Sequence, residues 1–242
     1  MDITQETYKL LGQRLLGTFD SKEYVDWAVK LLSSGQETES LVILAGMDND
    51  STEDREKYFW KAVSELKIDA NKTDYELIDN YALKLADQVI NKQVTPRVGL
   101  STMLEIVRRT DYDQKYIQFY EIDEDIDYVF YSGTPLFNQG LTKDNIDDYI
   151  IKEFKLLIEL SKINFDNSIY DKAFCNSCGQ VVKPFLKTKY QLKRPFSYLL
   201  PTCPNCKSMD LNDFRTQIGR EKIIRDKQTA PNSSYNQWLV DE

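Results

Sequence analysis

The chain has 242 residues, of which 41% are hydrophobic and 12% aromatic, so it can bury a real core and lacks the composition of a disordered protein. Its formal net charge is −8, and it contains no histidine. The absence of histidine excludes Ser-His-Asp triads, Cys-His pairs and His-Glu-x-x-His zinc proteases, so any enzyme here would have to use carboxylates, lysine, tyrosine or a metal ion.

The first ten residues, MDITQETYKL, lack the basic and apolar regions of a secretory signal, and the apolar run at residues 41–45 is too short to cross a bilayer. We therefore expect a cytoplasmic protein with no membrane partner. In that compartment thiols stay reduced, so paired cysteines point to a metal rather than to disulfides.

Apolar residues recur at helical spacing through most of the first 165 residues, between recognisable start and stop signals. Thr73 and Glu76 have the pattern of a capping box, and Thr95 precedes a first-turn proline. Short connections favour antiparallel neighbours, so we predict a helical bundle. Its helices are predicted from Ser21 to Gly35, over residues 39–45, from Ser51 to Leu66, from Thr73 to Val89, from Thr95 to Val107 and from Thr142 to Ile158.

Charge divides the chain into two regions. Residues 1–165 carry a balance of −12, whereas residues 166–242 carry 12 basic and 8 acidic side chains, a balance of +4. This change predicts a domain boundary near Phe165–Tyr170, with an acidic all-helical domain over residues 1–165 and a second domain over residues 170–242 that ends in a tail.

All four cysteines of the chain lie in the second region, as two Cys-x-x-Cys pairs separated by 24 residues. Each such turn lets two thiolates face one ion, and two turns complete a tetrahedral site. We therefore predict that Cys175, Cys178, Cys203 and Cys206 bind a metal, with zinc favoured over iron. Gly179 follows the first pair and allows its turn a positive φ, whereas no glycine follows the second pair, which predicts a stiffer kind of turn there.

The segment from Phe174 to about Phe214 resembles a zinc ribbon, a small antiparallel β module with a cysteine turn at each end of a hairpin. Its Cys-Pro-Asn-Cys turn is also similar to half of an iron-binding rubredoxin site. The resemblance implies a structural metal, since four thiolates leave no open position. The predicted fold is mainly α, with an N-terminal helical bundle followed by a small β zinc ribbon.

Between Lys172 and Lys207 the chain has seven basic residues and no acidic ones. Five of them are candidates for contact with nucleic acid, because aromatic residues are interleaved with them. Alternatively, these cations solvate a hairpin and balance the thiolates, or dock on the acidic helical region. The five are Lys183, Lys187, Lys189, Lys193 and Arg194.

An acidic run, YEIDEDIDY, occupies residues 120–128. It lacks the glycine and the twelfth-position glutamate of a calcium loop, so it is either a solvated face or a surface for a basic protein. The four candidate contact residues are Asp123, Glu124, Asp125 and Asp127.

Residues 1–165 resemble the small acidic helical proteins among bacterial immunity proteins, on stretches such as SLVILAGMDND and FYEIDEDIDY. The resemblance implies a protein that binds and neutralises a partner toxin. We therefore expect a non-enzymatic, zinc-binding interaction protein of the immunity type. The alternative is a zinc-ribbon protein that binds nucleic acid or has a regulatory role. An enzyme acting through carboxylates is the third possibility.

Overall fold

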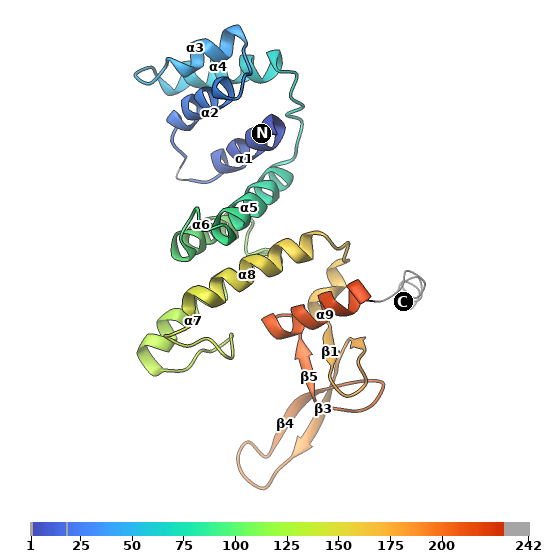
Figure 1. Cartoon of the computed structure of the whole chain (residues 1–242). Helices are drawn as coiled ribbons and strands as arrows, with labels where there is room; N and C mark the ends of the chain where they lie inside the picture. Colours follow the sequence, from blue (N-terminus) through green and yellow to red (C-terminus); the bar gives the residue numbers. More distant parts are fainter. Residues whose placement is uncertain (1, 18, 230–242) are drawn as a thin grey trace. The chain divides into compact units, whose positions relative to one another are not determined.

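The computed structural model describes residues 2–17 and 19–229, and in this part of the chain helices predominate (Figure 1). The prediction of a mainly α fold is therefore confirmed. The chain forms two compact units, Met1–Tyr120 and Glu121–Glu242, whose division falls inside one helix. This division differs from the one that the charge pattern predicts, because residues 121–165 are grouped with the cysteine-bearing segment.

The first unit contains the helices α1 (Ile3–Arg14), α2 (Lys22–Ser33), α3 (Glu39–Ala45), α4 (Thr52–Glu65), α5 (Asp74–Ile90), α6 (Pro96–Arg109) and the first residues of α7 (Ile117–Ser132). The predicted helices from residue 21 to residue 107 correspond to α2 to α6. In the capping box of α5, the Thr73 hydroxyl accepts from the Glu76 amide and the Glu76 carboxylate accepts from the Thr73 amide. Neither α1 nor α7 was predicted.

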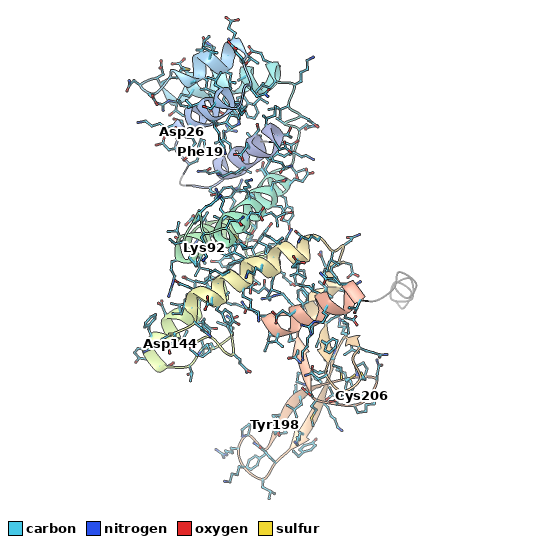
Figure 2. The ribbon with its side chains drawn as sticks, viewed as in Figure 1. Phe19, Asp26, Lys92, Asp144, Tyr198 and Cys206 are labelled. Atoms are coloured by element: carbon cyan, nitrogen blue, oxygen red, sulfur yellow. The ribbon has the colours of Figure 1, made fainter. Side chains whose placement is uncertain are left out.

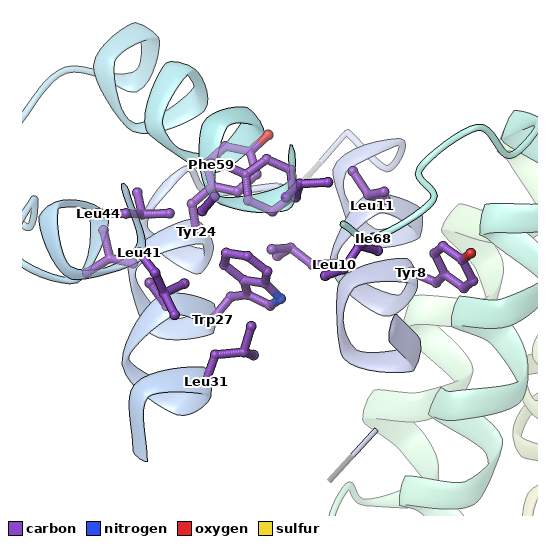
Figure 3. Close-up of a cluster of buried hydrophobic side chains, with 14 of the residues drawn as sticks. Tyr8, Leu10, Leu11, Tyr24, Trp27, Leu31, Leu41, Leu44, Phe59 and Ile68 are labelled. Carbon is purple, nitrogen blue, oxygen red and sulfur yellow. The ribbon is translucent and has the colours of Figure 1, made fainter. Parts of the chain in front are cut away.

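The core of this unit is an aromatic and aliphatic cluster between α1, α2, α3 and α4 (Figure 3). The rings of Tyr24 and Phe59 stack at 4.5 Å between centroids, and Trp27 meets Phe59 edge-on at 5.0 Å. Helix α1 packs closely on α5 at Gly12, where an added Cβ would lie 2.3 Å from the Leu77 carbonyl oxygen. Only glycine permits this approach of two helices.

The second unit contains the rest of α7, then α8 (Ile146–Ser161), a 3-10 turn (Asn167–Asp171), the strands β1 (Ala173–Cys175), β2 (Val181–Val182), β3 (Phe185–Tyr190), β4 (Ser197–Thr202) and β5 (Leu211–Asp213), and α9 (Gln217–Thr229). One sheet has the order β2-β1-β5, and β3 pairs with β4 in a separate hairpin, both antiparallel. Residues 217–229, which were expected to belong to a tail, form α9 instead. The remainder of that predicted tail lies outside the described residues.

A small apolar core and a buried ion pair are among the contacts that join α9 to the rest of the second unit. Ile223 of α9 packs in a small core with Ile169 and Phe214, beside the β2-β1-β5 sheet. Arg220 of α9 forms a buried ion pair with Glu153 of α8. The sheet next to the cysteines is therefore attached to helices on both sides of the boundary that charge predicts.

Candidate metal centre

The four cysteines come together from two turns that are far apart in sequence. Cys175 ends β1 and Cys178 lies in the turn that follows, while Cys203 and Cys206 follow β4. Figure 2 labels Cys206 in this turn and Tyr198 in the adjoining hairpin. The ligand atoms of all four residues lie within 4.8 Å of one another.

The sulfur distances fit a single tetrahedral ion. Sγ of Cys175 lies 3.5 Å from Sγ of Cys206, and Sγ of Cys178 lies 3.8 Å from Sγ of Cys203. A regular tetrahedron with metal–sulfur bonds of about 2.3 Å has edges of about 3.8 Å. The cluster could therefore hold one metal ion, and the four thiolates would fill its coordination shell.

The two cysteine turns have matching backbone hydrogen bonds. In the first, the Cys175 amide donates to Gln180 O at 2.9 Å and the Gly179 amide donates to Cys175 O at 2.8 Å. In the second, the Cys203 amide donates to Ser208 O at 2.8 Å and the Lys207 amide donates to Cys203 O at 3.1 Å. Each turn therefore presents its two cysteines in the same way.

Lys207 takes the place of a glycine in the second turn. Its φ is +61°, beside +71° for Gly179 at the equivalent position of the first turn. The expectation of a different, stiffer turn was wrong, since a lysine here adopts the left-handed conformation that is uncommon outside glycine. The Lys207 ammonium donates to Pro204 O at 2.6 Å and lies 5.3 Å from the centroid of the Phe185 ring.

Backbone amides near the sulfur atoms influence the thiol pKa values. The amide of Cys206, followed by that of Asn205, lowers the pKa of Cys203 to about 7. The Gln180 amide acts in the same direction on Cys178, but burial and the neighbouring thiols outweigh it and raise the pKa of Cys178 to about 12. Amides directed at sulfur stabilise thiolate, which is the form that binds metal.

The predicted basic contact residues all lie at or near the β3–β4 hairpin and are exposed. Lys187 and Lys189 lie in β3, and Lys193 and Arg194 lie in the turn that follows. Lys183 lies just before β3, and its ammonium is 3.4 Å from the Asp171 carboxylate. The structure thus brings four of the five cations to one element.

The acidic run does not form a single exposed face. It lies in α7, where Asp127 is exposed and Asp123 and Glu124 are half-buried, but Asp125 is fully buried. The Asp125 carboxylate accepts from the amides of Leu136, Phe137 and Asn138. The expectation that Asp125 lies on a contact surface is corrected accordingly. Contact of the other three with a partner stays a prediction.

Sequence reasoning missed an exposed aromatic surface beside these carboxylates. Tyr128, Phe130 and Tyr131 of α7 are exposed, and so are Leu136 and Phe137 of the loop that Asp125 holds. The signal was present, because the buried residues of α7 follow a helical stripe and leave these aromatics outside it. The stripe consists of Phe119, Ile122, Ile126 and Val129.

Among the described residues, no helix is long and apolar enough to pass through a bilayer. Comparison of the chain with protein-family models, curated proteins and solved structures gave no match.

Proposed function

We propose that the four cysteines bind one zinc ion and that residues 174–214 form a zinc-ribbon module. The sulfur distances and the amides beside Cys203 support this proposal. A closed four-thiolate shell has no position for a substrate, so the ion has a structural role and the protein is not an enzyme of the metal-dependent kind. Elemental analysis should give one zinc per chain in colourless protein, whereas visible absorption would indicate iron.

We further propose that the protein is a non-enzymatic interaction protein of the cytoplasm that binds a basic protein partner. The observation that carries this proposal is the exposed surface of Tyr128, Phe130, Tyr131, Leu136 and Phe137, called here the α7 surface. Tyr131 is 93% exposed, although an aromatic ring of this size gains much from burial. Aromatic residues are enriched at the centres of protein interfaces.

The loop part of the α7 surface is fixed before any partner arrives. Asp125 accepts from the Leu136 amide at 2.5 Å and from the Asn138 amide at 2.6 Å, and the Asn138 side chain donates to it at 2.9 Å. A surface that is already ordered loses less conformational entropy on binding. Asp125 therefore acts through the loop that it positions and does not contact the partner.

Acidic residues give the α7 surface its electrostatic preference. Glu124 and Asp127 lie on the same helix as the exposed aromatics, and Asp123 precedes them. Acidic side chains on the helix that carries the aromatics favour a basic partner and accelerate association with it. Neutralisation of a toxin, as in immunity proteins, is the most concrete form of this function.

The test uses proteins encoded next to this gene, expressed and purified one at a time. Calorimetry should show a 1:1 complex with a basic toxin-like protein, and growth assays should show that co-expression removes its toxicity. Phe130→Ala with Tyr131→Ala should weaken binding by at least about tenfold. Tyr75→Ala, which removes an exposed tyrosine of α5, serves as the control and should bind normally. Equal binding by both variants would contradict the proposal.

Nucleic-acid binding is the second candidate, and it rests on the exposed cations of the β3–β4 hairpin. It has less support than the protein partner, because the same hairpin exposes leucine side chains that bases and phosphates would leave in water. The β3–β4 hairpin therefore fits a partner that also covers apolar side chains.

A further inference from the structure

The β3–β4 hairpin is uncovered. All six residues of β3 are exposed, and among the described residues β3 and β4 pair only with each other. Tyr190 is 80% exposed, Leu186 is 62% exposed, and Leu192 in the connecting turn is 99% exposed. Isolated two-stranded hairpins are only marginally stable in water. Apolar side chains exposed in this way therefore indicate that a binding partner covers them.

Both faces of the hairpin carry apolar side chains. Because opposite residues of an antiparallel pair share a face, the register places Leu186 and Tyr190 on one face with Leu199. The other face carries Phe185 and Tyr198, together with Lys187 and Lys189. The turn adds Leu192 and Phe196 at the tip. A partner that covers the tip, with apolar groups on both faces, must surround it rather than lie against one side of it.

The charge of the hairpin selects an anionic occupant. Lys187, Lys189, Lys193 and Arg194 belong to it, and no acidic residue occurs anywhere between Lys172 and Lys207. Each Lys or Arg near an anionic lipid surface strengthens binding to it.

The polar backbone groups at the tip are partly satisfied within the turn. The Gln191 amide donates to Phe196 O at 2.8 Å, and the Gln191 side chain donates to Pro195 O at 2.7 Å. Pro195 has no amide hydrogen to satisfy. These hydrogen bonds lower the free-energy cost of moving the tip out of water, because unpaired backbone N–H and C=O groups are unfavourable in apolar surroundings.

We propose that the tip of the β3–β4 hairpin inserts into the surface of an anionic bilayer. Leu192 and Phe196 enter the boundary between headgroups and acyl chains, Tyr190 lies at the headgroup level, and the four cations contact lipid phosphates. Insertion stops at this depth, since in the part of the chain that the structure describes the outer edges of the two strands have no partner strands. The cysteine turns hold the base of the hairpin.

A bilayer fits these observations better than the other anionic partners do. It surrounds an inserted tip on all sides, which an acidic protein surface does not. Nucleic acid would use the cations and the aromatic rings but would leave Leu192 at the tip in water. The proposal replaces the earlier expectation of no membrane partner, which rested on the lack of a long apolar run. It does not depend on the α7 surface or on its partner.

The test is co-sedimentation of the full, metal-loaded chain with vesicles in which about one lipid in four is phosphatidylserine, and with vesicles of phosphatidylcholine alone. The tip variant Leu192→Gln with Phe196→Gln removes apolar groups. The charge variant changes Lys187, Lys189, Lys193 and Arg194 to Gln. The control Val98→Gln removes an exposed apolar residue of α6. Metal content and circular dichroism check that each variant is folded.

We expect binding to the anionic vesicles only, reduced at least about tenfold in both hairpin variants and unchanged in Val98→Gln. Absence of binding to anionic vesicles would overturn the proposal, as would binding that the tip variant retains. Anisotropy with fluorescent single-stranded RNA and DNA is the competing measurement. Nucleic-acid binding that is lost in the charge variant but kept in the tip variant, without vesicle binding, would assign the hairpin to nucleic acid instead.

Discussion

Nη2 of Arg220 in α9 lies 2.5 Å from Oε2 of Glu153 in α8, and both side chains are buried, with exposures of 2% and 5%. Oε2 of Glu153 also accepts from the Gln217 side chain at 3.0 Å. The pair joins the cysteine-bearing part of the second unit to a helix that the charge pattern assigns to the acidic domain. A domain boundary near residue 165 would cut through this buried pair.

Breaking this pair should destabilise the second unit strongly. Arg220→Met leaves Glu153 as a buried charge without its cation, which costs about 3–5 kcal/mol of unfolding free energy. Hydrogen exchange at the amides of α8 and α9 measures the loss. The control is Arg108→Met, which breaks the exposed ion pair with Glu105 and should cost at most about 1 kcal/mol. Equal losses in the two variants would contradict the role of the buried pair.

Metal removal should unfold the hairpin and the cysteine turns but not the first unit. Metal binding contributes folding free energy to small metal-centred modules, and the helices of the first unit have their own core. After chelation, or in Cys178→Ser, amides between residues 175 and 210 should exchange fast while those of α2 to α5 stay protected. Ser177→Ala is the control. A collapse of the whole helical circular-dichroism signal would show that both units depend on the metal.

Asp125 and Asp127 should behave differently when each is changed to Asn. Asp125→Asn replaces a buried carboxylate that holds three backbone amides, so the unfolding free energy should fall by about 2–3 kcal/mol. Asp127→Asn alters an exposed side chain and should change it by at most about 0.5 kcal/mol. Urea titration monitored at the second unit compares them. Similar small effects would mean that the loop does not need Asp125.

Glu121 should make stability depend on pH. Burial raises its pKa above the ordinary 4.5, with repulsion from Glu153 and Asp125 acting in the same direction and attraction to Arg215 and Arg220 opposing it. The folded chain therefore takes up this proton at a higher pH than the unfolded chain does. Near neutral pH the Glu121 carboxyl group is ionised in both the folded and the unfolded state, and only in the folded state is this charge destabilised by burial.

Glu121→Gln should accordingly raise the denaturation midpoint at neutral pH. The gain should shrink as the pH falls through the folded-state pKa and vanish below the ordinary value, where wild-type Glu121 is protonated in both states. Glu124→Gln is the control, and the measurement is a series of urea titrations across the acidic range. A gain that is constant with pH would show that the effect does not come from ionisation.

Local signals in the sequence predicted much of the fold. The helices from residue 21 to residue 107, the capping box of α5 and each Cys-x-x-Cys turn all depend on residues within one or two turns of each other. Helix α7 could also have been predicted from the sequence, since its buried residues recur at helical spacing. They are Phe119, Ile122, Ile126 and Val129. The acidic residues between them favoured the interpretation of this segment as a charged surface.

The features that sequence reasoning missed depend on contacts between distant residues. Asp125 is buried because amides from 11 to 13 positions away turn back onto it, as for Leu136 and Asn138. Lys207 adopts a glycine-like φ because the second cysteine turn closes in the same way as the first. Helix α1 is held by the approach of Gly12 to Leu77 in α5, which a search for local periodicity does not detect.

The two inner cysteines also allow the segment between them to be replaced by one of another sequence or length. Cys178 and Cys203 enclose 24 residues, yet their sulfur atoms lie only 3.8 Å apart. Loop-closure entropy grows slowly with length, so a longer or shorter segment changes the closure free energy little once an ion fixes its ends. The centre is thus a natural graft site, where a foreign loop can replace residues 184–202 without disturbing the helices.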